Sequence, residues 1–161
     1  MNQNLLNDNP LPELIGTAPL DTIGLVIASV DPMLRTEMGI DSQYTALGLI
    51  SSRTGAAGQI LAVDEAVKET NTSVLSIDLP RDTKGWGGHG NFIILGAKKV
   101  TDAKRAVESA LEHIKQYAGE VHINDAGHLE FAYSASAGEA IHKAFSVPLG
   151  HPFGFMAGSP A

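Results

Sequence analysis

The stretch NFIILGAKKVTDAKRAVESALEHIKQYAG, Asn91 to Gly119, contains a strand pattern followed directly by a helix pattern. Its first seven residues are mostly aliphatic or aromatic and predict a buried strand at 91–97. Thr101 is a suitable N-cap, and apolar residues then recur at three- and four-residue steps as far as Tyr117, before Gly119 ends the helix. The stretch therefore predicts a strand followed by a helix with one apolar face.

Similar patterns lie on both sides of this stretch. Runs of β-branched and aliphatic residues, and apolar residues at helical spacing, predict strands at 22–31, 45–52 and 72–79 and helices at 32–38, 58–71 and 138–145. Polarity alternates with period two around a turn at Asn124 to Gly127, which predicts a β-hairpin. The expected fold class is therefore α/β (α+β).

The composition limits the classes of partner. The 161 residues are enough for one ordinary globular domain. Eleven basic residues against eighteen acidic ones give a net charge of −7, and the basic residues are scattered, which argues against nucleic acid as a partner. The absence of cysteine excludes disulfides and thiolate metal sites. No apolar run approaches the roughly 20 residues of a membrane span, and the polar start does not resemble a signal peptide, so we expect a cytosolic protein without a membrane partner.

A glycine-rich segment, RDTKGWGGHG at 81–90, separates the strands expected at 72–79 and 91–97. A phosphate-binding loop would place its last glycine at the start of a helix, whereas Gly90 runs into a strand. Trp86 is surrounded by glycines and has few local packing partners, which favours an exposed or interface position. The segment is therefore interpreted either as a lid or as part of an assembly.

No catalytic or metal-binding constellation is evident from the residues. His122 and His128 flank the hairpin turn and are predicted to face each other, but two histidines do not complete a metal site. Serine residues lie near acids and histidines without a nucleophile-elbow motif. We predict no catalytic residue, metal or cofactor. The residues alone leave two functions open, a small-molecule-binding enzyme with a glycine-rich lid and an assembly protein.

Two segments, AVDEAVKETNTSVLSIDL and NFIILGAKKVTDAKRAVESAL, resemble the core of the bacterial microcompartment shell domain. The residues at matching places are Asp64, Lys68, Asn71, Gly96, Val100, Ala103, Ala106 and Val107. The segments ELIGTAPLDTIGLVIASVD, RTGAAGQILAVDEAVK and RDTKGWGGHGNFIILGAKKVTDAKRAVE resemble the permuted tandem, trimer-type members found in propanediol-, ethanol- and ethanolamine-utilisation compartments. The resemblance extends over about 13–161.

The polar, proline-punctuated residues 1–19 predict a flexible N-terminal extension. The resemblance implies that a circularly permuted domain follows at 20–161, with a mainly antiparallel sheet and helices packed on it. Family members with two such domains close into a trimer shaped like a hexagon, a tile whose pore passes small polar metabolites. This chain is then half of a tandem or one subunit of a hexamer-like ring. The implied partners are further copies, other shell proteins and, through the extension, encapsulated enzymes. The implied location is a microcompartment shell in the bacterial cytoplasm.

The resemblance also implies roles for particular residues. Lys68 and Asn71 correspond to positions at the tile edge. The glycine-rich segment corresponds to a pore-facing loop, and its candidate metabolite-facing residues are Asp82, Lys84, Gly85, Trp86, Gly87, Gly88, His89 and Gly90.

Overall fold

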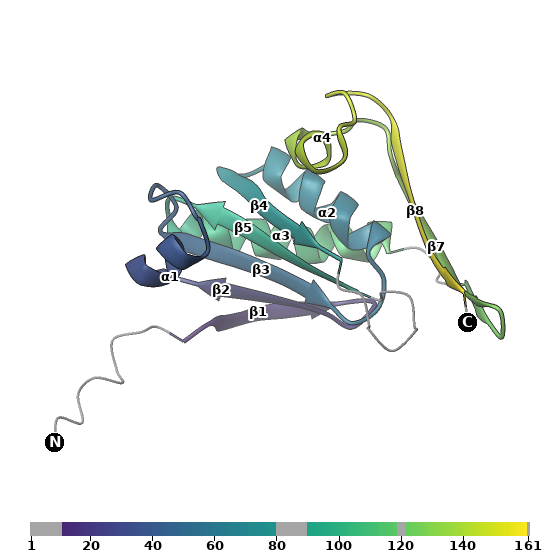
Figure 1. Cartoon of the computed structure of the whole chain (residues 1–161), viewed down its shortest axis with the longest axis horizontal. Coiled ribbons are helices and arrows are strands. Elements are labelled where there is room, and N and C mark those ends of the chain that lie inside the picture. The colour runs from purple at the N-terminus through teal and green to yellow at the C-terminus, as the bar shows by residue number, and fades with distance from the viewer. Residues whose placement is uncertain (1–10, 80–89, 119–121, 161) are drawn as a thin grey trace, which may run out of the picture.

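The computed structural model describes residues 11–79, 90–118 and 122–160. A five-stranded antiparallel sheet forms its centre, with strand order β1-β2-β3-β5-β4 (Figure 1). The strands are β1 (Glu13–Ala18), β2 (Thr22–Ile27), β3 (Ala46–Ser52), β4 (Thr72–Asp78) and β5 (Asn91–Ala97). Strands β1 and β4 are therefore the two edges of this sheet.

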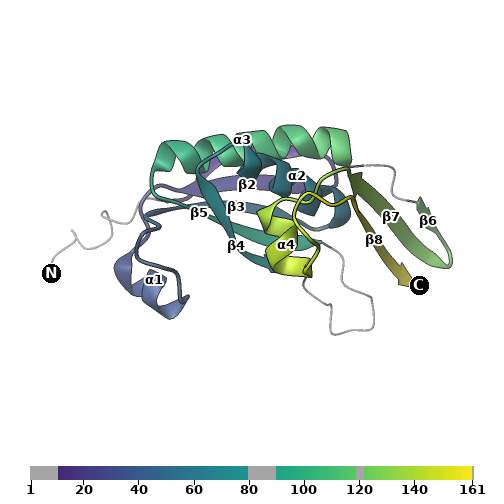
Figure 2. The same cartoon turned by 90° about the horizontal axis from the view of Figure 1, so that it is seen from above.

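Helices α2 (Ala57–Lys68) and α3 (Val100–Tyr117) cover one face of the sheet (Figure 2). Gly24 and Gly48 lie beneath α3, and a Cβ at these positions would lie 2.6 and 2.7 Å from methyl carbons of Val107. Glycine on two neighbouring strands therefore lets the helix approach the sheet closely. Helix α1 (Pro32–Glu37) lies beside the sheet, and the Asp31 carboxylate accepts hydrogen bonds from the backbone N–H groups of Met33 and Leu34.

A second, three-stranded sheet has the order β6-β7-β8 and is also antiparallel. It consists of β6 (His122–Asn124), β7 (Gly127–Ser134) and β8 (Phe153–Pro160), and the short helix α4 (Glu139–Phe145) connects β7 to β8. The Phe145 ring packs on the rings of Phe153 and Phe155, with centroid separations of 5.9 and 5.4 Å. These aromatic contacts hold α4 against the strand that follows it.

Most of the expected elements are confirmed. Strand β5 has the predicted bounds, and β3, β4, α1 and α4 differ from prediction by one residue at one end. The mixed α/β fold with an antiparallel sheet is also confirmed. None of the helices in the described part of the chain has both the length and the apolar character that crossing a membrane requires.

The prediction of a flexible extension over 1–19 is wrong for Glu13–Ala18, which forms β1. Ile15 and Ala18 pack on the main core, and Glu13 forms an ion pair with Lys104 of α3, with an oxygen–nitrogen distance of 2.6 Å. The strand is short and interrupted by Gly16, so its pattern is weak in the sequence. Residues 1–10 lie outside the described residues.

Four local predictions also need correction. Strand β2 ends at Ile27 instead of Asp31, and α2 ends at Lys68 because the Thr70 hydroxyl donates to the Ala66 carbonyl and turns the chain into β4. Helix α3 begins at Val100 with Lys99 as N-cap and without a side-chain cap, not at Thr101. In the hairpin, His122 pairs with Leu129 and His128 with Ile123, so the two histidines are not directly opposite each other.

Two buried carboxylates connect the second sheet and α4 to the main core. The Glu130 Oε1 atom of β7 accepts hydrogen bonds from the backbone N–H groups of Ala56 and Ala57, at 2.6 and 3.3 Å, at the start of α2. Asp64 of α2 accepts hydrogen bonds from the N–H groups of Gly138 and Ile141, at 2.7 and 3.1 Å, at the start of α4. Negative charge at a helix N-terminus is favourable, so each carboxylate stabilises a helix that belongs to another part of the chain.

We expect Glu130→Ala to lower the free energy of unfolding by about 2–3 kcal/mol, because it leaves buried N–H groups without a partner. The melting temperature should fall by roughly 5–10 °C. Glu108→Ala is the matched control, since Glu108 is exposed on α3. Equal melting temperatures for the two variants would show that the Glu130 cap contributes nothing to stability.

Candidate functional site

Lys68 is the last residue of α2, and its ammonium group contacts three oxygen-bearing partners. The Nζ atom lies 2.7 Å from Glu65 Oε1, 2.7 Å from the Ser136 carbonyl oxygen and 3.2 Å from Asp64 Oδ2. Burial acts to lower the pKa of Lys68, but the hydrogen bonds and ion pairs with Glu65 and Asp64 outweigh it, so its pKa is raised. The lysine is thus part of an ion-pair cluster as well as a surface residue.

This cluster connects α2 to the chain entering α4. The Asp64 side chain is fully buried, whereas the Lys68 side chain is 30% exposed and covers it. A Cβ at Gly138 would lie 2.6 Å from Lys68 Cε and 2.8 Å from Asp64 Oδ1. Only glycine leaves room for the lysine stem and the carboxylate at this place, so the cluster depends on the sequence of both segments.

Asn71, the second predicted edge residue, is exposed in the bend between α2 and β4. It lies three residues after Lys68 and directly before the edge strand β4. The structure therefore places both predicted edge residues at the same end of α2, next to an unpaired sheet edge. The edge role of Lys68 and Asn71 stays a prediction.

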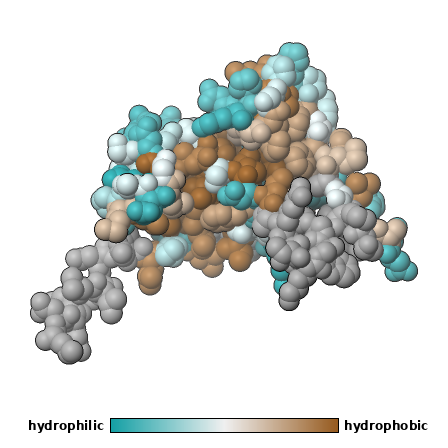
Figure 3. All heavy atoms as spheres, in the orientation of Figure 1, coloured by the Kyte–Doolittle hydropathy of each residue, from teal (hydrophilic) through white to brown (hydrophobic). Residues whose placement is uncertain are grey.

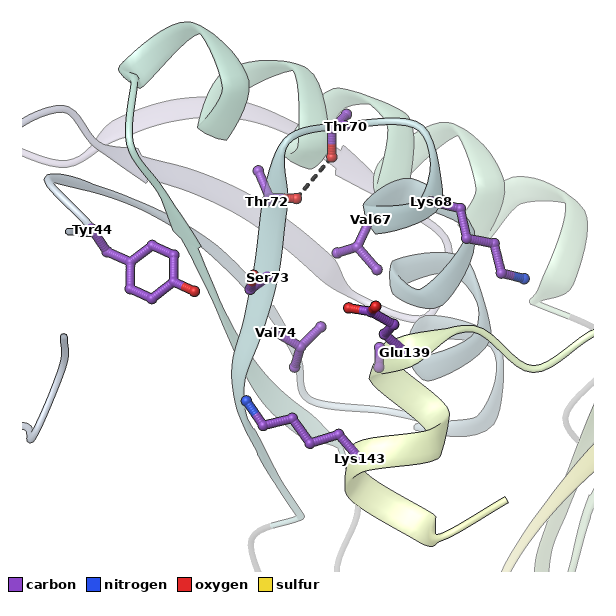
Figure 4. A pocket seen from close by; sticks show the side chains of 10 residues that line it. Tyr44, Val67, Lys68, Thr70, Thr72, Ser73, Val74, Glu139 and Lys143 are labelled. Carbon is purple, nitrogen blue, oxygen red and sulfur yellow. Dashed lines mark hydrogen bonds between the residues drawn. The ribbon is translucent and has the colours of Figure 1, made fainter. Parts of the chain in front are cut away.

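A polar groove of about 460 Å³ lies beside Lys68, between β4 and α4. Figure 4 shows Glu139 and Lys143 of α4 and Tyr44 around it, while the Lys68 ammonium turns away from it. The hydroxyl groups of Thr70 and Thr72 bond to each other at 2.7 Å along its rim. The described lining residues of the groove supply hydroxyl and charged groups, and none of these hydroxyl groups is held by a base.

The glycine-rich segment connects β4 to β5, and its two ends are held firmly. Asp78 at the end of β4 pairs with Phe92 of β5. Gly90 has φ +95°, and a Cβ there would clash with the carbonyl oxygen of Ser52. Because the backbone conformation and the lack of space both require glycine, a larger residue at position 90 would strain the junction.

Buried polar side chains hold the backbone next to Gly90. The Asn91 amide donates to Ser52 Oγ at 2.8 Å and to the Gly55 carbonyl at 3.2 Å. The Gln59 amide donates to Thr22 Oγ1 and to the Thr54 carbonyl, both at 3.2 Å. The end of the sheet that carries the loop is therefore a rigid polar platform.

Seven of the eight predicted pore residues, Asp82, Lys84, Gly85, Trp86, Gly87, Gly88 and His89, lie outside the described residues. Gly90 is the eighth and is placed at the base of the loop, as described above. Sequence reasoning missed Asn91, Gln59 and Glu130. No local pattern singled out Glu130, because the alternation along its strand favours burial of the apolar Leu129, Phe131 and Tyr133 and exposure of Glu130. In the described part of the chain, no group of three or more metal-ligating side chains comes together.

The chain is similar to known proteins of one family. Residues 46–125 match the BMC domain. The chain is 50% identical over 151 residues, 94% of its length, to the bacterial microcompartment shell protein PduB of Citrobacter freundii. It is 41% identical over 162 residues, its full length, to the PduB protein of Limosilactobacillus reuteri, of which it covers 68%. This chain belongs to the family of bacterial microcompartment shell proteins.

The fold agrees with this family assignment. The described structure superposes with a TM-score of 0.80 on a trimeric bacterial microcompartment shell protein PduB, at 41% identity, covering 92% of this chain and 66% of the other. The BMC match begins at β3, so β1 and β2 precede it and pair beside it in the sheet, as the expected circular permutation would place them. The chain spans 56% of the Citrobacter freundii PduB protein.

We expect the Lys68 cluster to contribute stability that disappears at alkaline pH. A lysine whose pKa is raised by folding contributes fully below its unfolded pKa of about 10.4 and loses the contribution as pH rises through the folded pKa. Lys68→Met removes the charge and keeps much of the stem. The difference in melting temperature between the native protein and this variant should therefore be largest below about pH 10 and shrink by about pH 11.5. A difference that is constant over this range would assign the effect to packing alone.

Proposed function

We propose that this chain is a structural shell protein of a bacterial microcompartment of the propanediol-, ethanol- or ethanolamine-utilisation type, and not an enzyme. The observation that carries the proposal is the similarity over nearly the whole chain to curated shell proteins named PduB. Copies of the chain, alone or with the remainder of a tandem, form flat tiles in the facets of a shell within the bacterial cytoplasm. Other shell proteins are the neighbours of such tiles.

The loop between β4 and β5 is proposed to line a pore through which small polar metabolites pass. Its support is the rigid polar platform formed by Gly90, Asn91 and Gln59, which fixes the ends of the loop while the glycines between them carry no side chains. Where several copies of a loop surround one axis, glycines let the backbones approach and present N–H and C=O groups to a polar solute. Asp82, Lys84 and His89 then set the charge at the opening, and Trp86 acts as a plug or a packing anchor.

The proposed tile edge contains Lys68 and Asn71. The edge role is supported by the position of both residues beside the edge strand β4 and by the partial exposure of Lys68. The N-terminal residues 1–11 are proposed to contact encapsulated enzymes, and the support is their polarity and their lack of a periodic apolar face.

The alternative, a small-molecule-binding enzyme with the glycine-rich segment as a lid, has weaker support. The polar groove between β4 and α4 holds no paired nucleophile and base among its described lining residues. The names of the similar proteins also describe shell components. Electron microscopy separates the two functions directly, because purified shell protein should form sheets, tubes or hexagonal tiles and an enzyme should not.

The family resemblance implies that Lys68 meets its counterpart in the next tile across a two-fold axis. We therefore expect Lys68→Asp to abolish sheets and leave the single tile intact, because two acidic groups would repel each other there. Lys68→Met is the matched control for the lost ion pairs with Asp64 and Glu65. Negative-stain microscopy reports the sheets, and size-exclusion chromatography reports the tile. Sheets of native extent from a folded Lys68→Asp protein would remove Lys68 from the edge.

We expect replacement of Gly87 and Gly88 by bulky residues to slow metabolite passage without unfolding the tile. A suitable measurement is the entry of a small polar substrate into assembled compartments that contain an enzyme for it. A Glu108→Ala variant, on the exposed side of α3, serves as the control. Unchanged entry in both variants would contradict a pore-facing loop.

A further inference from the structure

The end of the five-stranded sheet that carries the glycine-rich segment also carries an exposed ion pair between Arg53 and Asp21. Arg53 Nη2 lies 3.2 Å from Asp21 Oδ2, and the two side chains are 86% and 56% exposed. The Thr54 hydroxyl donates a hydrogen bond to the same carboxylate oxygen at 3.3 Å. Asp21 therefore binds two neighbouring side chains of the loop that follows β3.

The pairing of the strands fixes the position of this ion pair. Thr22 pairs with Ser52, and Ser52 pairs with Asn91, so the β1–β2 turn, the end of β3 and the start of β5 lie at one end of the sheet (Figure 1). A Cβ at Gly90 would lie 3.0 Å from the carbonyl carbon of Arg53. The backbone of Arg53 therefore lies directly against the base of the loop that is proposed to line the pore.

The β1–β2 turn holds Asp21 in place. Leu20 and Asp21 have φ of 62° and 55°, a conformation that aspartate tolerates better than leucine. A Cβ at Gly55 would lie 2.7 Å from Leu20 Cδ1, so glycine there leaves room for the leucine side chain. The Thr22 hydroxyl donates to the Pro19 carbonyl across the turn at 2.7 Å. The turn is thus anchored on the loop that carries the arginine.

The charges of the ion pair act on solutes more than on the fold. Exposed ion pairs contribute little to stability, but surface charges set the electrostatic potential that an approaching solute meets. In Figure 3 apolar residues dominate the middle of the visible face, so little charge is available there to select a solute. Repeated around the axis of a tile, unpaired arginines would form a ring that attracts anions. An aspartate beside each arginine cancels most of that attraction.

We propose that Asp21 is a specificity-determining residue of the pore, because its pairing with Arg53 prevents an anion-selective ring and favours neutral solutes that carry hydroxyl or carbonyl groups. The Thr54 hydroxyl and the remaining N–H groups of Arg53 offer hydrogen bonds to such solutes. Asp78, at the end of β4 on the other side of β5, adds a negative charge at the same end of the sheet and acts in the same direction. The inference rests on the proposed pore, and it adds a residue outside the glycine-rich segment and a class of solute.

The test measures the ion selectivity of tiles in a planar lipid bilayer. A gradient of potassium chloride across the bilayer gives the anion-to-cation permeability ratio from the reversal potential. We expect Asp21→Asn to raise this ratio several-fold, because it leaves Arg53 unpaired while asparagine keeps the positive φ of the turn. Asp21→Asn combined with Arg53→Gln should restore a ratio near the native one. Glu108→Gln is the matched control, since it also removes one negative charge but lies in the middle of α3.

A second measurement compares a neutral solute with an anion of similar size. Compartments that contain an enzyme oxidising ethane-1,2-diol or glycolate report the entry of each solute. Asp21→Asn should leave entry of the diol unchanged and speed entry of glycolate. Circular dichroism and size-exclusion chromatography verify that the variants fold and assemble.

The outcomes separate this inference from the proposed pore. Equal permeability ratios for the native protein and Asp21→Asn would overturn the inference, and the pore would stand if replacement of Gly87 and Gly88 still slowed entry. A rise with Glu108→Gln as large as that with Asp21→Asn would also overturn the inference, because overall charge would then explain the change. Absence of any conductance through native tiles would contradict the pore and the inference together.

Discussion

The carboxylates of Asp64 and Glu130 lie in the interior, and each accepts hydrogen bonds from backbone N–H groups at the start of a helix from a distant part of the chain. Helix α2 is central to both contacts, since Glu130 caps its N-terminus and its own Asp64 caps α4. These caps act together with the apolar contacts of Ala132, Ala140 and Ile141 to fix the second sheet and α4 on the main core. The positions of Lys68 and of strands β7 and β8 follow from this arrangement, because Lys68 covers Asp64 and β7 contains Glu130.

Close packing of α3 on the sheet is the second constraint. Gly24 and Gly48 bring Val107 against the backbone of β2 and β3, and the large aliphatic residues of β5 fill the space beside them. All the large side chains of the helix-covered face are thereby used inside one chain. On the other face, Leu47 and Ile94 are buried in a small second cluster with Val30, whereas Ile23 and Phe92 stay 45% and 37% exposed. Contact with another copy would remove these exposed residues from water.

Local patterns predicted most of the elements because the buried strands and α3 have strong periodicity. Strand β5 is entirely apolar between its polar first residue and its glycine, and α3 carries its apolar stripe over five turns, so neither needs tertiary information. Strand β1 was missed because six residues with a central glycine carry little periodic signal, and pairing with β2 together with the Glu13–Lys104 ion pair decides its place. For the candidate site, the sequence indicated Lys68, Asn71 and the glycine loop only through resemblance to the family.

The sequence by itself determined the fold class, the order of the main elements and the family, because these depend on local periodicity and on segments that resemble known shell domains. Only the tertiary structure decided which polar residues form the buried hydrogen bonds that hold distant segments of the chain together. Glu130, Asn91 and Gln59 look like ordinary polar residues in the sequence, and their roles depend on backbone groups that lie far away along the chain. Likewise, the alternation along β7 predicts two different faces of a strand, but the position of α2 and α4 decides which face is buried. The physical reason is that burial and hydrogen bonding are properties of spatial neighbours, which a single sequence does not specify.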